Sequence, residues 1–375
     1  MAKRSGFAVE GALTLRSARC QSVYWDNGEL RIVNYLTRET FAANPVLLEV
    51  IRFFFAPKTI RDAMLEFDAY SPESVGEAVL DLIKAELLLE CDSPAAARDD
   101  LLDSSWKPWL PMGGYHFLTK DAPYLKGGGA RVRQKLRTIP NTPQPPQFKK
   151  IEDAKRFALP RPDSKSDTFF QTLHTRRTWR TFSPAPTPLA SISKLLQTTW
   201  GVQGFIESKY FDSAPLKTSP SGGARHPIEV YLMALRVKGL DPGLYHYDAM
   251  GHALERISSG ATPQKARAYC ADQAYTARAA ALFIMTAIFA RTMWRYGHAR
   301  AYRVVLLDAG HLGQTFCLTA TRLGLAPFVT AALKDSLIEK DLRIDGITES
   351  VLYVTGVGAP GRDEAHGIRC AQRAW

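Results

Sequence analysis

Three arginines and a hydroxyl residue stand close together in the second half of the chain. Arg176, Arg177, Thr178 and Arg180 fall within five consecutive positions. Guanidinium groups bind phosphate through paired hydrogen bonds, and a hydroxyl adds a neutral donor or acceptor. The cluster therefore indicates a phosphate site, although a solvent-exposed basic surface has the same composition.

A second segment has the residues that let backbone approach a flat ring. Pro220, Ser221, Gly222 and Gly223 precede Arg225 and an apolar, strand-like run. Adjacent glycines bring no Cβ atoms against a ligand, and the Ser221 hydroxyl can bond a polar ligand atom. An ordinary glycine turn is the alternative interpretation.

A third group lies on an apolar helical pattern that follows Tyr302. It includes Asp308, Gly310, His311 and Gln314, and spacings of three and four residues place Gly310 and Gln314 near one face. We expect a structural role for Asp308. For His311, ligand binding and packing are equally good interpretations.

In this order the three groups resemble the SagB-type, McbC-like branch of the flavin-dependent nitroreductase family. The resemblance covers about residues 165–360. It implies an α+β fold with a central mixed or antiparallel sheet flanked by helices, and a homodimer that holds FMN at its interface. Many members of this branch oxidise azolines in peptides to azoles.

The resemblance also implies which residues contact FMN. The arginine cluster would meet the phosphate and ribityl chain, residues 220–223 would approach the flavin bound mainly by the other subunit, and a loop at 324–330 would place backbone amides at flavin N5. No metal site is expected. The expected cofactor-binding residues are Arg176, Arg177, Thr178, Arg180, Pro220, Ser221, Gly222, Gly223, Arg225, His311, Gln314, Pro327, Val329, Thr330 and Arg362.

The expected catalytic pair, Arg295 and Tyr296, departs from the family pattern. Azoline-oxidising members have Lys-Tyr here, and a guanidinium stays protonated at ordinary pH, so Arg295 cannot replace lysine as a neutral base. We expect Tyr296 to exchange protons with the substrate, and Arg295 to bind a carboxylate or stabilise an enolate or phenolate. An azoline, an amino-acid side chain and a tailored aromatic group all remain candidate substrates.

Two further regions precede this domain. Residues 1–105 predict a hairpin that turns at Asp26-Asn27-Gly28 and then three helices, at 45–55, at 59–67 and from Ser71 onward. This order resembles winged-helix, PqqD-like precursor-recognition domains. Residues 106–165 are a basic connector rich in Pro and Gly, and residues 166–375 form the FMN-binding domain.

The N-terminal region has two competing roles, peptide capture by strand addition to a sheet edge and structural or dimer packing. DNA binding is the least favoured use, because residues 1–106 are net acidic although the whole chain has net charge +11. The excess positive charge lies in residues 107–180, where we expect a solvated linker face, and no nucleic-acid partner is expected.

Composition favours a cytoplasmic enzyme. The 375 residues are 46% hydrophobic, and the five cysteines include no Cys-x-x-Cys pair. The longest apolar run, 279–290, is too short to cross a membrane and predicts a buried strand, and the N-terminus lacks the apolar region of a secretory signal.

The sequence therefore predicts an FMN-dependent oxidoreductase in natural-product (RiPP-like) biosynthesis. Its substrate would be a peptide-borne or peptide-derived intermediate, with hydride transfer to flavin N5 and reoxidation by oxygen. A biosynthetic enzyme is a candidate partner beside the second subunit. The alternatives are an NAD(P)H-dependent nitro or quinone reductase, and a flavin-free scaffold or peptide-binding pseudoenzyme.

Overall fold

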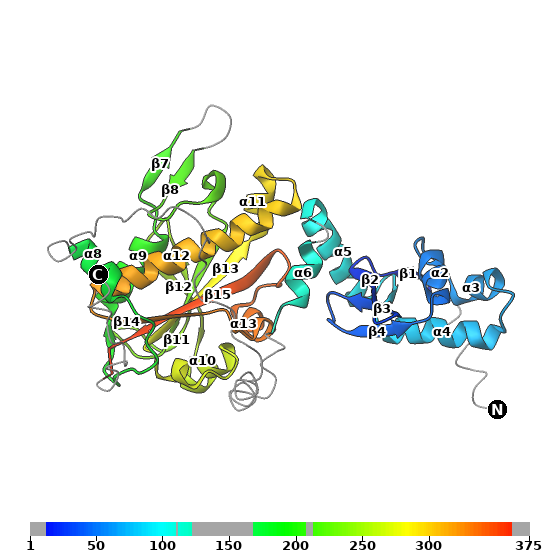
Figure 1. The fold of residues 1–375 in the computed structure, drawn as a ribbon, viewed down its shortest axis with the longest axis horizontal. Helices are drawn as coiled ribbons and strands as arrows, with labels where there is room; N and C mark the ends of the chain where they lie inside the picture. The colour runs from blue at the N-terminus through cyan, green and yellow to red at the C-terminus, as the bar shows by residue number, and fades with distance from the viewer. Residues whose placement is uncertain (1–12, 110–111, 122–167, 208–212, 362–375) are drawn as a thin grey trace, which may run out of the picture. The chain divides into compact units, whose positions relative to one another are not determined.

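A computed structural model describes residues 13–109, 112–121, 168–207 and 213–361 of the chain (Figure 1). The chain divides into two compact units. The N-terminal unit comprises residues 1–119 together with 296–302, and the C-terminal unit comprises residues 120–295 and 303–375. A short segment from late in the sequence thus belongs to the N-terminal unit.

The N-terminal unit contains a three-stranded antiparallel sheet of order β2-β3-β4. The strands are β2 (Gln21–Asp26), β3 (Glu29–Asn34) and β4 (Thr40–Ala43). Asn27 and Gly28 have φ of 50° and 82°, as the two-residue turn of a tight hairpin requires. The predicted hairpin is confirmed.

Three helices follow this sheet: α2 (Val46–Phe53), α3 (Ile60–Glu66) and α4 (Pro72–Lys84). The Thr59 side chain accepts from the Asp62 amide while Asp62 accepts from the Thr59 amide, which closes a capping box. Ser71 caps α4, where Pro72 occupies the first turn. The three predicted helices are therefore present, with α2 two residues shorter at its C-terminal end than expected.

The unit also contains a two-stranded sheet, which is followed by another helix. β1 (Leu15–Ser17) pairs with β5 (Leu88–Glu90), and α5 (Pro94–Trp106) follows. Arg16 and Asp99 form a buried ion pair of 2.6 Å that links β1 to α5. Sequence analysis did not predict this pair, because the two residues are separated by most of the unit.

Part of the expected connector is helical. A 3₁₀ helix, η1 (Lys107–Trp109), and α6 (Met112–Leu118) lie in it. Trp109 and Phe117 are buried, so their apolar surface favours packing over an extended linker. Residues 122–165 of the expected connector lie outside the described residues.

The C-terminal unit is built on a six-stranded antiparallel sheet of order β12-β11-β9-β13-β15-β14. Its strands are β9 (Ile228–Ala234), β11 (Gly243–Asp248), β12 (Ala253–Ser259), β13 (Ala281–Ile288), β14 (Ala326–Thr330) and β15 (Glu349–Gly358). β13 lies in the middle and is buried along nearly its whole length, as the apolar run predicted.

Helices cover both faces of this sheet, and β13 shows how the faces divide. Phe283 stacks on Trp200 of α9 (Leu189–Trp200) and packs against Phe316 of α12 (Tyr302–Arg322). Its neighbours Leu282 and Ile284 point to the other face, in a core shared with α10 (Pro263–Tyr269) and α13 (Asp335–Leu342). Figure 1 shows the long helix α12 running along the sheet.

The shorter elements connect this framework. They are α8 (Thr168–Thr175), β6 (Thr187–Pro188), β7 (Gly204–Ile206), β8 (Ala214–Leu216), η4 (Gly222–Ala224), β10 (Val237–Lys238), η5 (Ala274–Arg278), α11 (Phe289–Arg295) and η6 (Ala299–Ala301). Among the described residues, no helix combines the length and apolarity needed to span a membrane.

Candidate functional site

The arginine cluster follows directly after α8. Arg177 donates from Nη1 to the carbonyls of His174 and Arg176, each at 2.7 Å, which fixes the turn out of the helix. In the part of the chain that the structure describes, no carboxylate forms an ion pair with Arg176, Arg177 or Arg180. Clustered cations without acidic partners form a site suited to an anion such as phosphate.

The arginine cluster meets β14, although about 150 positions separate them in the sequence. The Trp179 amide donates to the Pro327 carbonyl at 2.8 Å. The Arg180 guanidinium lies 5.7 Å from the centre of the Tyr275 ring, which packs edge-on against Phe328 of β14. Two of the three predicted groups of flavin contacts are therefore neighbours.

The segment predicted as a loop at 324–330 is an edge strand from Ala326 onward. Among the described strands it pairs with β15 alone, so no described strand lies along its outer edge. Proline is tolerated at an edge because it has no N–H to give to a ladder. The Pro327 carbonyl faces outward to Trp179, so alternation along the strand turns the Val329 amide to the same outer edge. The prediction of a loop was therefore wrong for Ala326–Thr330. The Val329 amide nevertheless points outward, as the predicted contact with a flavin requires.

Thr330 uses its hydroxyl inside the protein. Its Oγ1 accepts from Gln273 Nε2 and from the Ala332 amide, both at 3.1 Å. These bonds fix the end of β14, and a flavin contact for Thr330 stays a prediction.

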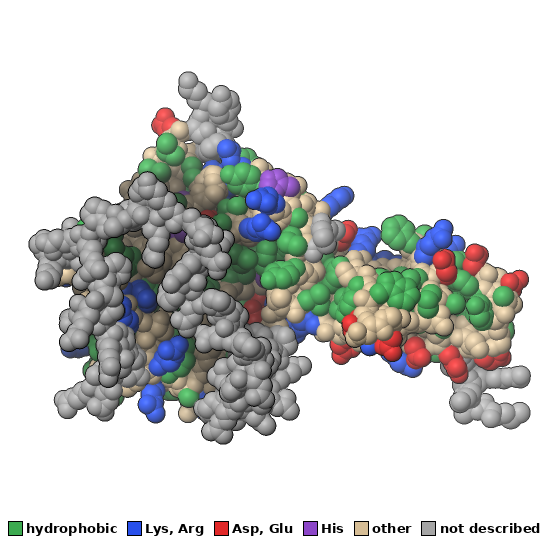
Figure 2. All heavy atoms as spheres, in the orientation of Figure 1, with side chains coloured by type: hydrophobic (Ala, Val, Ile, Leu, Met, Phe, Trp, Pro, Cys, Tyr) green, Lys and Arg blue, Asp and Glu red, His purple; other side chains and the backbone are tan. Residues whose placement is uncertain are grey.

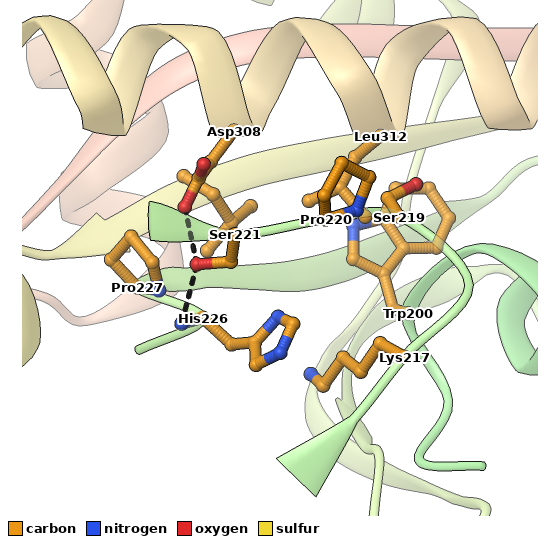
Figure 3. A pocket seen from close by; sticks show the side chains of 10 residues that line it. Trp200, Lys217, Ser219, Pro220, Ser221, His226, Pro227, Asp308 and Leu312 are labelled. Carbon is orange, nitrogen blue, oxygen red and sulfur yellow. Dashed lines mark hydrogen bonds between the residues drawn. The ribbon is translucent and has the colours of Figure 1, made fainter. Parts of the chain in front are cut away.

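The glycine segment is locked onto α12 by Asp308 (Figure 3). Ser221 Oγ donates to Asp308 Oδ2 at 2.5 Å, the Gly222 amide donates to Oδ1 at 3.3 Å, and the His226 amide donates to Ser221 Oγ at 2.9 Å. Burial raises the pKa of Asp308, and the Ser221 and Gly222 donors oppose this by stabilising the carboxylate. The structural role predicted for Asp308 is confirmed, and the Ser221 hydroxyl proton is directed to Asp308.

Both glycines of the segment are required by its geometry. A Cβ on Gly222 would lie 2.2 Å from Val304 Cγ1 of α12. Gly223 has φ of 62°, a left-handed conformation that side chains disfavour. The glycines therefore let the segment lie flat against the helix.

The two remaining predicted contacts on α12 are exposed. His311 Nδ1 lies 3.3 Å from the Pro220 carbonyl, so this side chain also touches the glycine segment. Gln314 lies one turn further along and is exposed. Arg362 lies outside the described residues.

The glycine segment also contacts α11, which ends at Arg295. Arg225 lies over the Trp294 ring, 5.2 Å from its centre, and Arg291 Nη1 donates to the His226 carbonyl at 3.1 Å. Arg295 is exposed at the end of this helix. Tyr296 is half-buried and belongs to the N-terminal unit.

Sequence reasoning missed two titratable residues beside the glycine segment. Lys217 and His226 line a small cavity of about 10 Å³ together with Trp200, Ser221 and Asp308 (Figure 3). Burial and then the Lys217 charge lower the pKa of His226 to about 4, and burial lowers the pKa of Lys217. His226 is therefore neutral, with Nε2 placed to donate to the Pro215 carbonyl at 3.0 Å. His226 occupies a variable position just before Pro227 in the glycine segment, and Lys217 precedes that segment, so neither residue type is specified by the pattern.

His246 lies within strand β11 and contacts two carboxylates. Its Nε2 lies 3.2 Å from Glu229 and its Nδ1 lies 2.8 Å from Glu255. Hydrogen bonding to Glu229, supported by Glu255, raises the pKa of His246 to about 9.

Within the described ranges, no group of three His, Cys, Asp or Glu side chains is arranged to hold a metal ion. The described residues therefore place the arginine cluster beside β14 and the glycine segment against α12 and α11.

Comparison with known proteins agrees with this architecture. The profile of the nitroreductase family matches residues 173–359. The chain is 26% identical over 325 residues to the trifolitoxin-processing protein TfxB of Rhizobium leguminosarum, covering 82% of this chain and 86% of that protein. It is 31% identical over 183 residues to a nitroreductase-like protein of Methanocaldococcus jannaschii, covering 49% of this chain and 88% of that protein.

The match to a third relative covers fewer residues. The microcin B17-processing protein McbC of Escherichia coli is 30% identical over 150 residues, covering 39% of this chain and 55% of that protein. The predicted family resemblance is confirmed by these matches. The chain belongs to the nitroreductase family, and its C-terminal part has the α+β fold of that family.

Proposed function

We propose that this protein is an FMN-dependent oxidoreductase that acts on a peptide-borne or peptide-derived intermediate in natural-product biosynthesis. The observation that carries this proposal is the extent of the similarity to TfxB. It covers 82% of the chain, whereas the nitroreductase profile covers residues 173–359 alone. The similarity to a peptide-processing protein therefore reaches beyond the nitroreductase part.

The residues present fit FMN. Arg176, Arg177 and Arg180 offer cations without recorded ion-pair partners in the described structure, and these would hold the phosphate. The outward amide of Val329 on β14 would donate to the ring. FMN supplies a two-electron acceptor for hydride when bound.

Arg295 and Tyr296 are our candidates for handling charge and protons on the substrate. The Arg295 guanidinium, exposed at the end of α11, would bind a carboxylate or stabilise developing negative charge. The Tyr296 phenol would exchange a proton with the substrate. Oxygen would serve as the final electron acceptor.

A second copy of this chain is the expected partner. Leu306 and Leu307 of α12 and Trp294 of α11 are exposed, with Leu307 at 61% and Trp294 at 65%. This apolar surface lies beside the glycine segment, which we expect to approach the flavin of the other subunit. A homodimer would bury the surface.

The N-terminal unit offers a site for peptide capture. A groove of about 310 Å³ is lined mainly by apolar side chains of α2 and α4 and of the residues after α3, and Asn44 at its rim directly follows β4. Among the described strands β4 pairs with β3 only, and an added peptide strand could pair with its other edge while the peptide side chains enter the groove. Figure 2 shows hydrophobic side chains gathered on the visible face of this unit, with acidic side chains along its border. The lining residues are Asn44, Val46, Leu47, Val50, Phe67, Tyr70, Ser74, Val75 and Ala78.

The proposal is tested by following substrate mass in air. FMN-loaded protein is incubated with a peptide that carries a thiazoline, and mass spectrometry records the product. We expect loss of two hydrogen atoms from the peptide. An unchanged peptide, together with consumption of NADPH and a nitroaromatic, would favour the reductase that the Methanocaldococcus relative suggests. Protein that refuses added FMN would favour a flavin-free scaffold.

A further inference from the structure

Residues 296–302 leave the C-terminal unit and pack in the N-terminal one. This segment joins α11 to α12, and it contains Tyr296 at its start and Tyr302 at its end. Both flanking helices belong to the C-terminal unit, so the segment is the place where the N-terminal unit holds a piece of the nitroreductase part of the chain.

The start of the segment is held by Trp109. The Trp109 indole Nε1–H donates to the Tyr296 backbone carbonyl at 3.0 Å, across 187 positions of sequence. Trp109 is fully buried, and its ring packs edge-on against Tyr302 with centres 6.1 Å apart. A buried indole in contact with both ends of a short segment leaves that segment little freedom.

The end of the segment is held by His116. Its Nδ1 lies 3.0 Å from the Tyr302 hydroxyl, and both side chains are buried. Trp106 stacks on the His116 ring with centres 5.2 Å apart and an angle of 22°. Aromatic residues of α5, η1 and α6 therefore pack around both ends of the segment 296–302.

We propose that Trp109 is a positioning residue for Tyr296. The inference rests on the proposed role of Tyr296 in proton exchange. The bond to the Tyr296 backbone carbonyl holds the backbone from which the Tyr296 side chain projects. A displacement of a reacting group by about 1 Å can lower the rate about a hundredfold. Trp109 would thus act through the backbone of Tyr296, in addition to any peptide capture by the groove.

The test replaces Trp109 with Phe in the full-length FMN protein. The W109F ring still fills most of the buried space, but it cannot donate to Tyr296. We expect hydrogen exchange in residues 296–302 to accelerate, and the limiting rate of anaerobic flavin reduction by a thiazoline peptide to fall about tenfold, the effect of losing one buried hydrogen bond. KM, FMN content and the rate of reoxidation by oxygen should stay at wild-type values.

Tyr35→Phe is the matched control. Tyr35 is buried in the same unit, its ring lies against Gly114 of α6, and its hydroxyl donates to the Gln21 carbonyl at 2.9 Å and lies 2.8 Å from Ser22 Oγ. Phenylalanine keeps the ring against α6 and removes only the hydroxyl. This variant loses a bond of the same kind, so it should leave exchange in 296–302 and the reduction rate unchanged.

Three results would overturn the inference. They are unchanged exchange in residues 296–302 of W109F, faster exchange with an unchanged reduction rate, and equal slowing in the Tyr35 control. Failure of the thiazoline peptide to reduce even the wild-type flavin would count against the proposed function. The exchange measurement then decides on its own whether Trp109 orders the segment, and unchanged exchange would reject the inference.

Discussion

Ser221 Oγ lies 2.5 Å from Asp308 Oδ2, so the hydroxyl of the glycine segment is bound to the middle of α12. The same carboxylate accepts from the Gly222 amide, and Ser221 accepts from the His226 amide. The order of the segment thus depends on a carboxylate of α12.

Asp308→Ala should loosen the glycine segment. Loss of two buried acceptors leaves Ser221 and Gly222 without their partner, and each unsatisfied buried group costs about 1–3 kcal/mol. We expect a lower midpoint of thermal unfolding and weaker FMN binding in a fluorescence titration. Asp308→Asn keeps an amide oxygen as acceptor and should lose less. Wild-type stability and affinity in the Ala variant would show that the lock is unimportant.

Gly222→Ala should be strongly disruptive, because the new Cβ would lie 2.2 Å from Val304 Cγ1. Valine is stiff about χ1 and cannot swing away easily. We expect reduced FMN content on purification, with recovery when Val304→Ala is added. Gly204→Ala serves as the control, since nothing lies within 4 Å of its Cβ position. Equal FMN content in G222A and G204A would refute the packing argument.

Arg176→Ala and Arg177→Ala should each weaken FMN binding by about 1.5–3 kcal/mol, the usual worth of a hydrogen bond to a charged group. The loss should shrink as salt rises, because salt screens the phosphate charge. Titration at two salt concentrations measures both effects. Arg267→Ala is the control, since this exposed arginine lies on α10 near Asp272. An equal effect of all three substitutions would mean that the cluster is no phosphate site.

The sequence predicted the parts of the site better than their connections. Local signals were sufficient for the hairpin at Asn27, the caps at Thr59 and Ser71, and the buried strand β13, because each depends on neighbours in the chain. The hydrogen bond from Trp179 to Pro327 joins residues that are far apart in the sequence. No pattern of neighbouring residues predicts that these two residues meet. The edge strand at Ala326 was missed for the same reason, since pairing with β15 decides it.

The shifted pKa values could not be predicted from the sequence either. The isolated residues Lys217 and His226 gain their lowered pKa values from burial in a pocket that forms only in the folded chain. His246 acquires the opposite shift from two carboxylates on neighbouring strands. Such shifts depend on distances that only the fold fixes.

His246 should make stability depend on pH. Its pKa rises from 6.5 to about 9 on folding, so the folded state binds the proton more tightly than the unfolded state. The resulting stabilisation is complete below about pH 6.5 and is lost as pH rises through 9. Thermal unfolding of wild type and His246→Gln should differ most at pH 6 and converge by about pH 10. A constant difference across this range would contradict the charged pairing with Glu229 and Glu255.

Leu307→Asp should weaken the expected homodimer. A carboxylate placed on the exposed apolar face of α12 would have to be desolvated on association. Sedimentation should show a shift from dimer toward monomer. Met250→Asp is the matched control, because Met250 is 70% exposed in a turn of the same unit. A dimer that persists in L307D but dissociates in the control would place the interface elsewhere.

The most direct test of the proposed function is the identity of the electron donor. FMN-loaded protein is mixed without oxygen with NADH, NADPH or a thiazoline peptide, and the flavin absorption band is followed with time. The proposal predicts that the peptide bleaches the flavin while both nicotinamides leave it oxidised. Rapid bleaching by a nicotinamide, with no response to the peptide, would contradict the proposal and identify a nicotinamide-driven reductase.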